Sequence, residues 1–275
     1  MICQTMFHIL LVVTVNAGLL ICGDDRYGQL GLGTNSLNSV ASPIEVQHLE
    51  TKGVDHMKAL AGSPVMQIAF GGDHSVALLE DGTVKAWGRN QHGQLGVADS
   101  ADRIEPVALP GVAGVVQVAV GSDHSLVLLA NGLVKVWGRN NYGQLGLDDT
   151  KDRNKPVMVD GIKGAVQVAA GNYHSIVLLD DSSVMVWGRN TYGQLGLGNN
   201  ADTAMPMKVH GLTNAKHIAA GGAHSFVLLQ TGLLMGFGQN AFGQLGLGHN
   251  NNRIYPTRVE TLSNVKHVVT GNDHS

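Results

Sequence analysis

The sequence predicts an all-β fold in which one four-stranded unit is repeated about five times. The 275 residues include 37 glycines and only 14% charged residues, and they contain no long helix-like hydrophobic run, which is typical of short buried strands joined by glycine turns. The last four copies of the tetrapeptide GQLG are 50 residues apart, and so are five copies of the dipeptide His-Ser. A period near 50 residues is typical of propellers and solenoids.

Each unit carries signals of four strands. The first is an apolar run that ends in glycine, such as VVQVAVG, and its small residues favour the innermost position. The second is HSLVLL or a variant, followed by a tight turn such as ANG and by a third strand such as VKVWG. After GQLG comes a polar loop and then a fourth strand, which we expect to begin at a proline and to lie at the outer edge. These prolines are Pro43, Pro106, Pro156, Pro206 and Pro256.

The two chain ends complement each other. HILLVVTVNAGLLICG, residues 8–23, matches a second and third strand without a first, whereas the chain ends at GNDHS, a first strand without the others. We therefore expect a propeller of about five blades, closed by pairing of the N- and C-terminal strands, because closure removes exposed sheet edges. An incomplete ring, or loss of two further blades from the C-terminal side, is the alternative. The expected domain spans residues 1–275, with repeats at about 8–64, 65–114, 115–164, 165–214 and 215–275.

Charge and cysteine content exclude several classes of partner. The formal net charge is −3 and no run of Lys and Arg occurs, which argues against nucleic acid and anionic membranes. Cys3 and Cys22 are too few for a disulfide framework, so a reducing compartment is expected. His8 and Asn16 interrupt the apolar N-terminal stretch, which lacks a basic region, so neither a leader nor a membrane span is expected.

The recurring polar residues are interpreted as structural. Adjacent His and Ser on a strand point to opposite faces, so they cannot form a nucleophile–base pair. Each histidine is expected to bond to the backbone of the next turn or blade. Copies in different blades lie too far apart for a metal site, no phosphate-loop GK[ST] follows the glycines, and neither a metal nor any other cofactor is expected. The packing aromatics are Trp87, Trp137, Trp187 and Phe237.

The repeated motifs G-x-x-HS-x-x-LL, WG-x-N and YGQLG resemble those of the regulator of chromosome condensation, RCC1. This family usually builds seven-bladed propellers, and its exchange factors act on the small GTPase Ran. The resemblance implies a nucleotide exchange factor that performs no covalent catalysis and acts as a monomer. We expect it in the cytoplasm. Further locations are the nucleus, or the cytosol of a host cell if the protein is a bacterial effector. The alternative is a binding scaffold or inhibitor without exchange activity.

The short connection between the first and second strands varies from copy to copy. Its third position holds Asp73, Asp123, Tyr173, Ala223 and Asp273, which must all lie on one rim of the ring. Aspartate is a good turn former, which gives a purely structural explanation. The functional interpretation is an acidic, aromatic-flanked rim that meets a basic partner. By resemblance, Asp73, Asp123 and Asp273, with Tyr173, are expected to face a Ran-type GTPase.

One loop is enlarged in a single copy. The interval from Gly28 to Gly93 is 65 residues, and the added residues fall at about 47–63. Long loops on rigid scaffolds often carry function, and the resemblance suggests a wedge that presses on the GTPase. A harmless lengthening is the alternative, because surface insertions cost little stability. The charged and titratable candidates in this loop are Glu50, Lys52, Asp55, His56 and Lys58.

Overall fold

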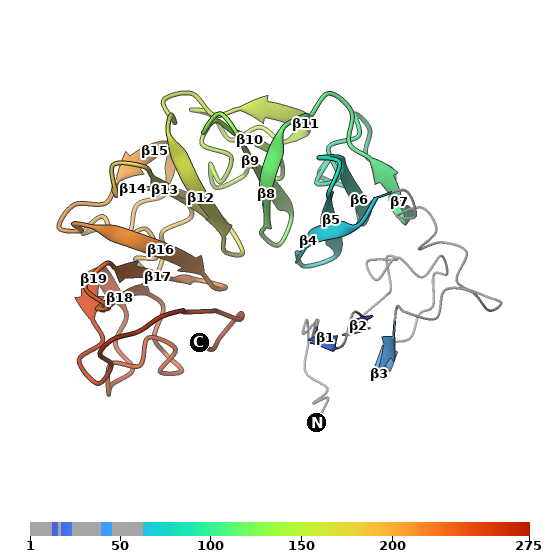
Figure 1. Ribbon diagram of the computed structural model, residues 1–275. Helices are drawn as coiled ribbons and strands as arrows, with labels where there is room; N and C mark the ends of the chain where they lie inside the picture. Colours follow the sequence, from blue (N-terminus) through green and yellow to red (C-terminus); the bar gives the residue numbers. More distant parts are fainter. Residues whose placement is uncertain (1–12, 16–17, 24–39, 46–62) are drawn as a thin grey trace.

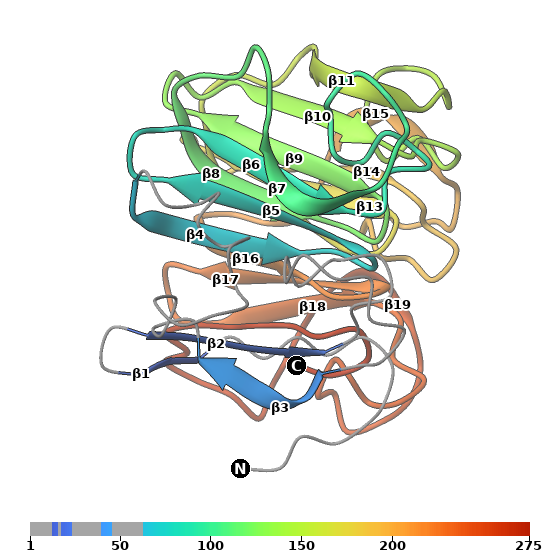
Figure 2. The same ribbon diagram turned by 90° about the vertical axis from the view of Figure 1, so that its right-hand side faces the viewer.

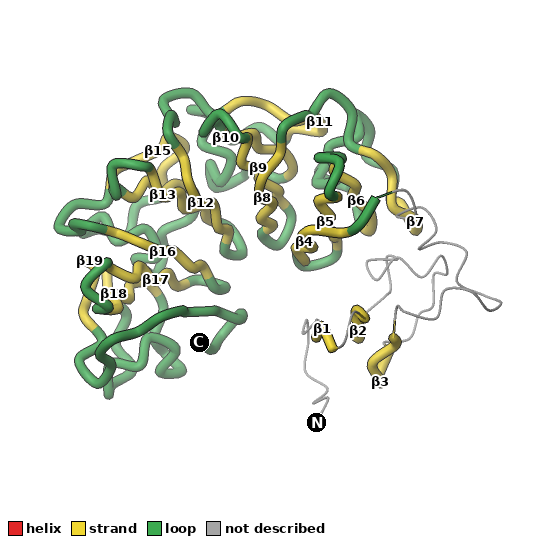
Figure 3. The backbone as a smooth tube through the Cα atoms, in the orientation of Figure 1, coloured by secondary structure: helices red, strands yellow, loops and turns green. Residues whose placement is uncertain are grey.

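The computed structural model describes residues 13–15, 18–23, 40–45 and 63–275. Within these ranges every regular element is a β-strand, as Figure 3 shows. The predicted all-β class is therefore confirmed. Sixteen of the strands form four four-stranded antiparallel sheets, each made from consecutive strands. These sheets are the predicted blades.

Each blade follows the same order from the centre outward. Figure 1 shows β4, β8, β12 and β16 nearest the axis and the last strand of each blade outermost, as expected. The first two blades contain β4 (Val65–Phe70), β5 (His74–Leu79), β6 (Val84–Gly88), β7 (Arg103–Ala108), β8 (Val115–Val120), β9 (His124–Leu129), β10 (Val134–Gly138) and β11 (Arg153–Met158). The next two contain β12 (Ala165–Ala170), β13 (His174–Leu179), β14 (Val184–Gly188), β15 (Thr203–Lys208), β16 (Ala215–Ala220), β17 (His224–Leu229), β18 (Leu234–Gly238) and β19 (Arg253–Arg258).

A smaller sheet stands at the N-terminal end of the arc. It consists of β1 (Val13–Val15), β2 (Gly18–Gly23) and β3 (Val40–Glu45) in that order. These strands correspond to the second, third and fourth strands of a blade. In the described residues no ladder joins the C-terminal segment to β1, so closure by pairing of the chain ends stays a prediction. The residues of the enlarged loop, Glu50 to Lys58, lie outside the described ranges.

The outer strands differ in one respect from the sequence-based expectation. Pro106 is the fourth residue of β7, not its first, and the other outer strands carry proline at the same place. The ladder from β6 to β7 is irregular here, between Ala86 and Gly88. A proline without an N–H is tolerated because β7 is an edge strand, and it prevents a further strand from adding at that point. The expectation that the proline begins the strand was wrong.

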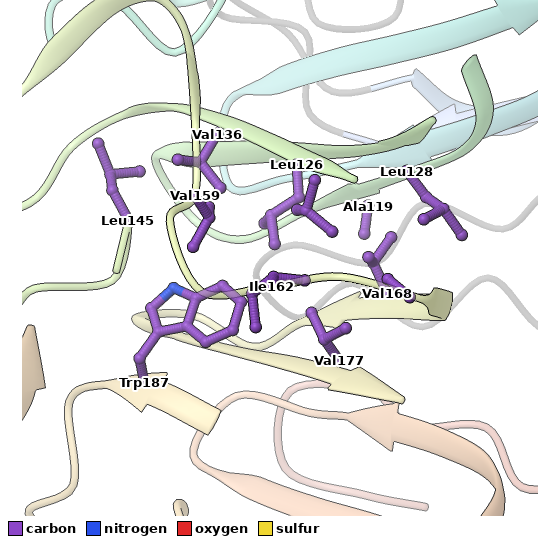
Figure 4. Close-up of a cluster of buried hydrophobic side chains, with 12 residues drawn as sticks. Ala119, Leu126, Leu128, Val136, Leu145, Val159, Ile162, Val168, Val177 and Trp187 are labelled. Carbon is purple, nitrogen blue, oxygen red and sulfur yellow. The ribbon is translucent and has the colours of Figure 1, made fainter. Parts of the chain in front are cut away.

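The hydrophobic core lies in the seams between blades. In the seam shown in Figure 4, Trp187 of β14 belongs to one buried cluster with Val136, Leu145 and Ile162 of the preceding blade, and all four are almost fully buried. Trp137 and Phe237 occupy the same place in the neighbouring seams. Because both faces of a blade are apolar, neither can be buried until a neighbour covers it.

A buried polar cluster, the seam clasp, joins the same blades. The Ser125 hydroxyl donates to the main-chain carbonyl of Gln94 in the preceding blade at 2.9 Å, so it accepts from His74 Nε2, 2.8 Å away. Trp137 Nε1 donates to that same carbonyl at 2.8 Å. We expected a backbone partner for the histidine, whereas its Nε2 bonds to a serine side chain of the next blade. A hydrogen bond to the backbone of Ser122 adds to this contact for His74 and acts to raise its pKa. The histidine and its own neighbour, Ser75, do not pair.

The clasp recurs along the arc. His124 Nε2 lies 3.1 Å from Ser175 Oγ, and His174 Nε2 lies 2.8 Å from Ser225 Oγ. Phe237 replaces tryptophan in the seam of Ser225, and its ring has no N–H to donate. Burial lowers the pKa of His74 and His224 to about 4, and that of His124 and His174 to about 3. The histidines are therefore neutral at pH 7.

Acid should weaken the fold before the carboxylates protonate. In the unfolded chain a histidine binds a proton below about pH 6.5, whereas in the folded protein His74 stays neutral down to about pH 4. Between these pH values the unfolded state binds more protons than the folded state. The free energy of unfolding therefore falls as the pH is lowered from about 6.5 to 4. We expect a loss of about 2 kcal/mol per clasp histidine between about pH 7.5 and 5. Urea unfolding at several pH values measures it, and a flat free energy of unfolding across this window contradicts it.

Candidate functional site

The strand connections form one rim of the arc, here called the connection rim. Figure 2 shows the strands of the blades crossing the thickness of the arc, so their ends lie at two opposite rims. Main-chain hydrogen bonds of 3.0–3.1 Å run from blade to blade through the second connection residue: Gly72 to Ser122, Ser122 to Asn172, Asn172 to Gly222, and Gly222 to Asn272. The third residues therefore hold equivalent positions, as predicted for Asp73, Asp123, Tyr173 and Asp273.

In two blades the connection aspartate is paired with arginine. The N–H of Arg89 donates to the main-chain carbonyl of Asp73 at 2.8 Å, and its Nη1 lies 3.2 Å from the Asp73 carboxylate. A side chain at the intervening Gly88, which has a φ of +103°, would place its Cβ 2.5 Å from that carbonyl oxygen. Glycine at this point therefore lets the two segments approach.

The next blade repeats this arrangement with Asp123 and Arg139, whose Nη1–Oδ2 distance is 3.3 Å. The two aspartate side chains are only 15% and 13% exposed. The carboxylates are consequently neutralised within their own blades instead of forming a free acidic surface. The signal in the sequence was the arginine that follows each of these aspartates at a spacing of 16 residues, which motif reasoning overlooked.

The following blade carries an aromatic arrangement at the same position. The Tyr173 ring contacts the Tyr142 ring edge-on, with 5.4 Å between centroids. The Arg189 guanidinium lies 4.7 Å from the Tyr142 centroid and 5.7 Å from that of Tyr173, which is cation–π geometry. We call Tyr142, Tyr173 and Arg189 the tyrosine–arginine patch. The last blade has Ala223 and Gln239 at the corresponding positions.

A polar pocket adjoins this patch. Its volume is about 170 Å³, and its lining includes Tyr173, Arg189, Gln239, Asn272 and Asp273. Asp273, unlike the two arginine-paired aspartates, is an exposed residue, and its carboxylate accepts a bond of 2.6 Å from Asn272 Nδ2. The pocket is therefore bounded by a guanidinium and by amide groups, with one carboxylate in its lining.

A second, more open groove of about 470 Å³ lies away from the connection residues. Its lining includes His92 and Asp152, whose ring nitrogen and carboxylate are 2.9 Å apart. No cluster of three or more His, Cys, Asp or Glu residues suited to a metal ion occurs in the described ranges. Among the same residues, no helix is long and apolar enough to cross a membrane.

Known proteins share this repeat pattern. The family model of the RCC1-like domain matches residues 2–275. The chain belongs to the RCC1-like domain family. In the crystal structure of human WBSCR16, a matching region is 29% identical and superposes with a TM-score of 0.80, covering 96% of this chain and 67% of that one. Yeast RCC1 (Prp20), solved with Kap60 bound, is 24% identical with a TM-score of 0.75, covering 93% and 62%. The latter likeness shows the fold alone.

Curated relatives in the RCC1-like family match a shorter stretch. "Probable E3 ubiquitin-protein ligase HERC4" of Homo sapiens is 40% identical over 84 residues, which are 30% of this chain and 7% of that protein. "Secretion-regulating guanine nucleotide exchange factor" of Bos taurus is 36% identical over 86 residues, which are 31% and 16%. The matched stretch is thus a small part of these longer relatives. The shared feature is a protein-interaction propeller.

Substitutions in the connection rim should cost less stability than substitutions in the seam clasp. Asp123→Ala removes a partly exposed ion pair and is expected to cost about 1 kcal/mol or less. Ser125→Ala leaves the buried His74 N–H without an acceptor and is expected to cost about 2 kcal/mol. Urea unfolding of both variants at pH 7.5 tests this order of stability. An Asp123→Ala variant as unstable as Ser125→Ala would mean that the aspartate chiefly supports the fold.

Proposed function

We propose that this RCC1-like protein is a guanine-nucleotide exchange factor for a Ran-type small GTPase, which it contacts through the connection rim. The observation that carries the proposal is the distribution of variation among the blades. The clasp serines, histidines and glutamines recur, whereas the third connection residue and its partner 16 residues later change from Asp–Arg to Tyr–Arg to Ala–Gln. The rim is thus a rigid frame that presents different side chains.

Relatives support the same proposal. Prp20p of Saccharomyces cerevisiae, one of the structural matches, has binding properties to Gsp1p and histones, and one curated relative is named an exchange factor. In RCC1-like exchange factors, acidic residues of this connection face Ran, which points to Asp73, Asp123 and Asp273 here. Asp73 and Asp123 are held rigidly by their arginines, so a partner's basic side chain could join each pair without reordering it.

Such a factor makes and breaks no covalent bond. It speeds nucleotide release because it binds the nucleotide-free GTPase more tightly than the loaded form, so its binding energy favours the state without nucleotide. A rigid rim suits this task, since a face that is already ordered loses little conformational entropy on binding. From the family resemblance we also propose the cytoplasm as the place of action and a wedge role for the enlarged loop at about 47–63.

Exchange is tested with Ran loaded with a fluorescent guanine nucleotide. Micromolar protein is expected to accelerate nucleotide release, and Asp123→Ala is expected to slow that release about tenfold, the effect of losing one charge-assisted contact. Glu80→Ala is the matched control, because Glu80 is an exposed acidic residue that follows β5 at the opposite rim. With Glu80→Ala, the rate of nucleotide release from Ran should equal the rate with the unmodified protein.

Two results would overturn the proposal. If the unmodified protein leaves the release rate unchanged, the chain is a binding scaffold or inhibitor without exchange activity. If Asp123→Ala and Glu80→Ala behave alike while exchange persists, the GTPase contacts another surface. Circular dichroism melting of each variant excludes loss of the fold as the reason.

A further inference from the structure

Arg189 differs from the arginines at the same position in the two preceding blades. Arg89 and Arg139 each form an ion pair with the aspartate of their own connection. For Arg189 that aspartate is replaced by Tyr173, and in the described part of the chain no carboxylate lies within ion-pair distance of it. The one hydrogen bond of its side chain there runs from Nε to Thr191 Oγ1, at 3.1 Å, which leaves both terminal nitrogens available.

The two tyrosines hold this guanidinium in place. Tyr142 comes from the loop after β10 and Tyr173 from the connection before β13, so the patch bridges two blades. At the position of Tyr142 in the preceding blade stands His92, which instead bonds to Asp152. Within the described residues, Arg139 therefore has a carboxylate and a histidine at the position of Tyr142, whereas Arg189 has no carboxylate and is supported by two tyrosines. Stacking orients the planar guanidinium and leaves its outer edge open.

The adjoining pocket supplies further hydrogen-bond donors. Gln239 and Asn172 line it together with Arg189, and its volume of about 170 Å³ suits the end of a single side chain. Asn172 Nδ2 already donates one bond, to Asn272 Oδ1 at 2.7 Å. Ala223 and Gln239, which replace an Asp–Arg pair in the last blade, contribute no charge. The guanidinium is thus the sole cation lining this pocket in the described residues.

We propose that the tyrosine–arginine patch binds an acidic side chain, Asp or Glu, of a partner protein. The planar guanidinium presents two parallel N–H groups that match a carboxylate, and rigid support lowers the entropy lost on binding. A carboxylate fits better than a phosphate group. With one cation and the Asp273 carboxylate in the same lining, a dianion would be repelled more strongly than a single negative charge.

This inference gives the rim a mixed character. The Asp–Arg pairs offer neutral, rigid contacts, while the patch offers a positive one, so a partner must carry an acidic residue opposite the patch. The inference concerns the chemistry of that contact and holds whether or not the chain promotes nucleotide exchange. Its test therefore uses a peptide and needs no GTPase.

The probe is a short glycine peptide with two adjacent glutamates and blocked ends, titrated into the full chain and followed by NMR of the tyrosine and arginine side chains. We expect saturable shifts at the patch that weaken as salt is added. Arg189→Gln should weaken the affinity about tenfold, the effect of losing a charge-assisted contact. Arg139→Gln, which removes the same charge at the equivalent paired position, should change the affinity less than about twofold.

A third variant uses the repeat itself. Tyr173→Asp copies the arrangement of the preceding blades, so Arg189 should gain an internal partner and lose the peptide, while the melting temperature stays near that of the unmodified protein. Equal losses of peptide affinity in Arg189→Gln and Arg139→Gln would mean that the peptide is attracted only by the overall positive charge of the rim, and this would overturn the proposal. Absence of saturable binding, or tighter binding of inorganic phosphate than of the peptide, would overturn it as well.

Discussion

The fold depends on one buried interaction, the serine hydroxyl that lies between two groups of the preceding blade. Ser125 donates to the carbonyl of Gln94 and accepts from the ring of His74, so two polar groups that burial would otherwise penalise satisfy each other across the seam. Because Trp137 donates to the same carbonyl, this contact also orients the largest apolar side chain in the seam. Packing and hydrogen bonding therefore require the same spacing between blades.

The constraint explains which positions are free to vary. The main-chain bonds through the connections and the clasp beneath them hold the backbone of the rim, so the third connection residue can be acidic, aromatic or small without disturbing its neighbours. A carboxylate there is balanced by Arg89 or Arg139, whereas a tyrosine there leaves its arginine open. Function can thus change along the rim while the blade stays the same.

Much of this was predictable from the repeats. The period, the strand order and the shared rim of Asp73, Asp123 and Tyr173 follow from recurrence, because equivalent positions in a repeat must occupy equivalent places. The partners across a seam were harder to predict. The bond from His74 to Ser125 spans 51 residues, and Gln67 likewise makes two bonds with the backbone of Val118 in the next blade, at 2.9 and 3.0 Å. Periodicity within one blade carries no information about such pairs, and the register between blades is needed.

The exchange of tryptophan for Phe237 has a mechanical consequence. In that seam the Gln194 carbonyl accepts from Ser225 alone, while the carbonyls of Gln94 and Gln144 each hold a serine and an indole. Cohesion between neighbouring blades is therefore uneven, and this junction is the weakest of the three. Under tension, or during thermal opening, the arc should part here first, carrying β16 to β19 away and splitting the pocket beside Arg189.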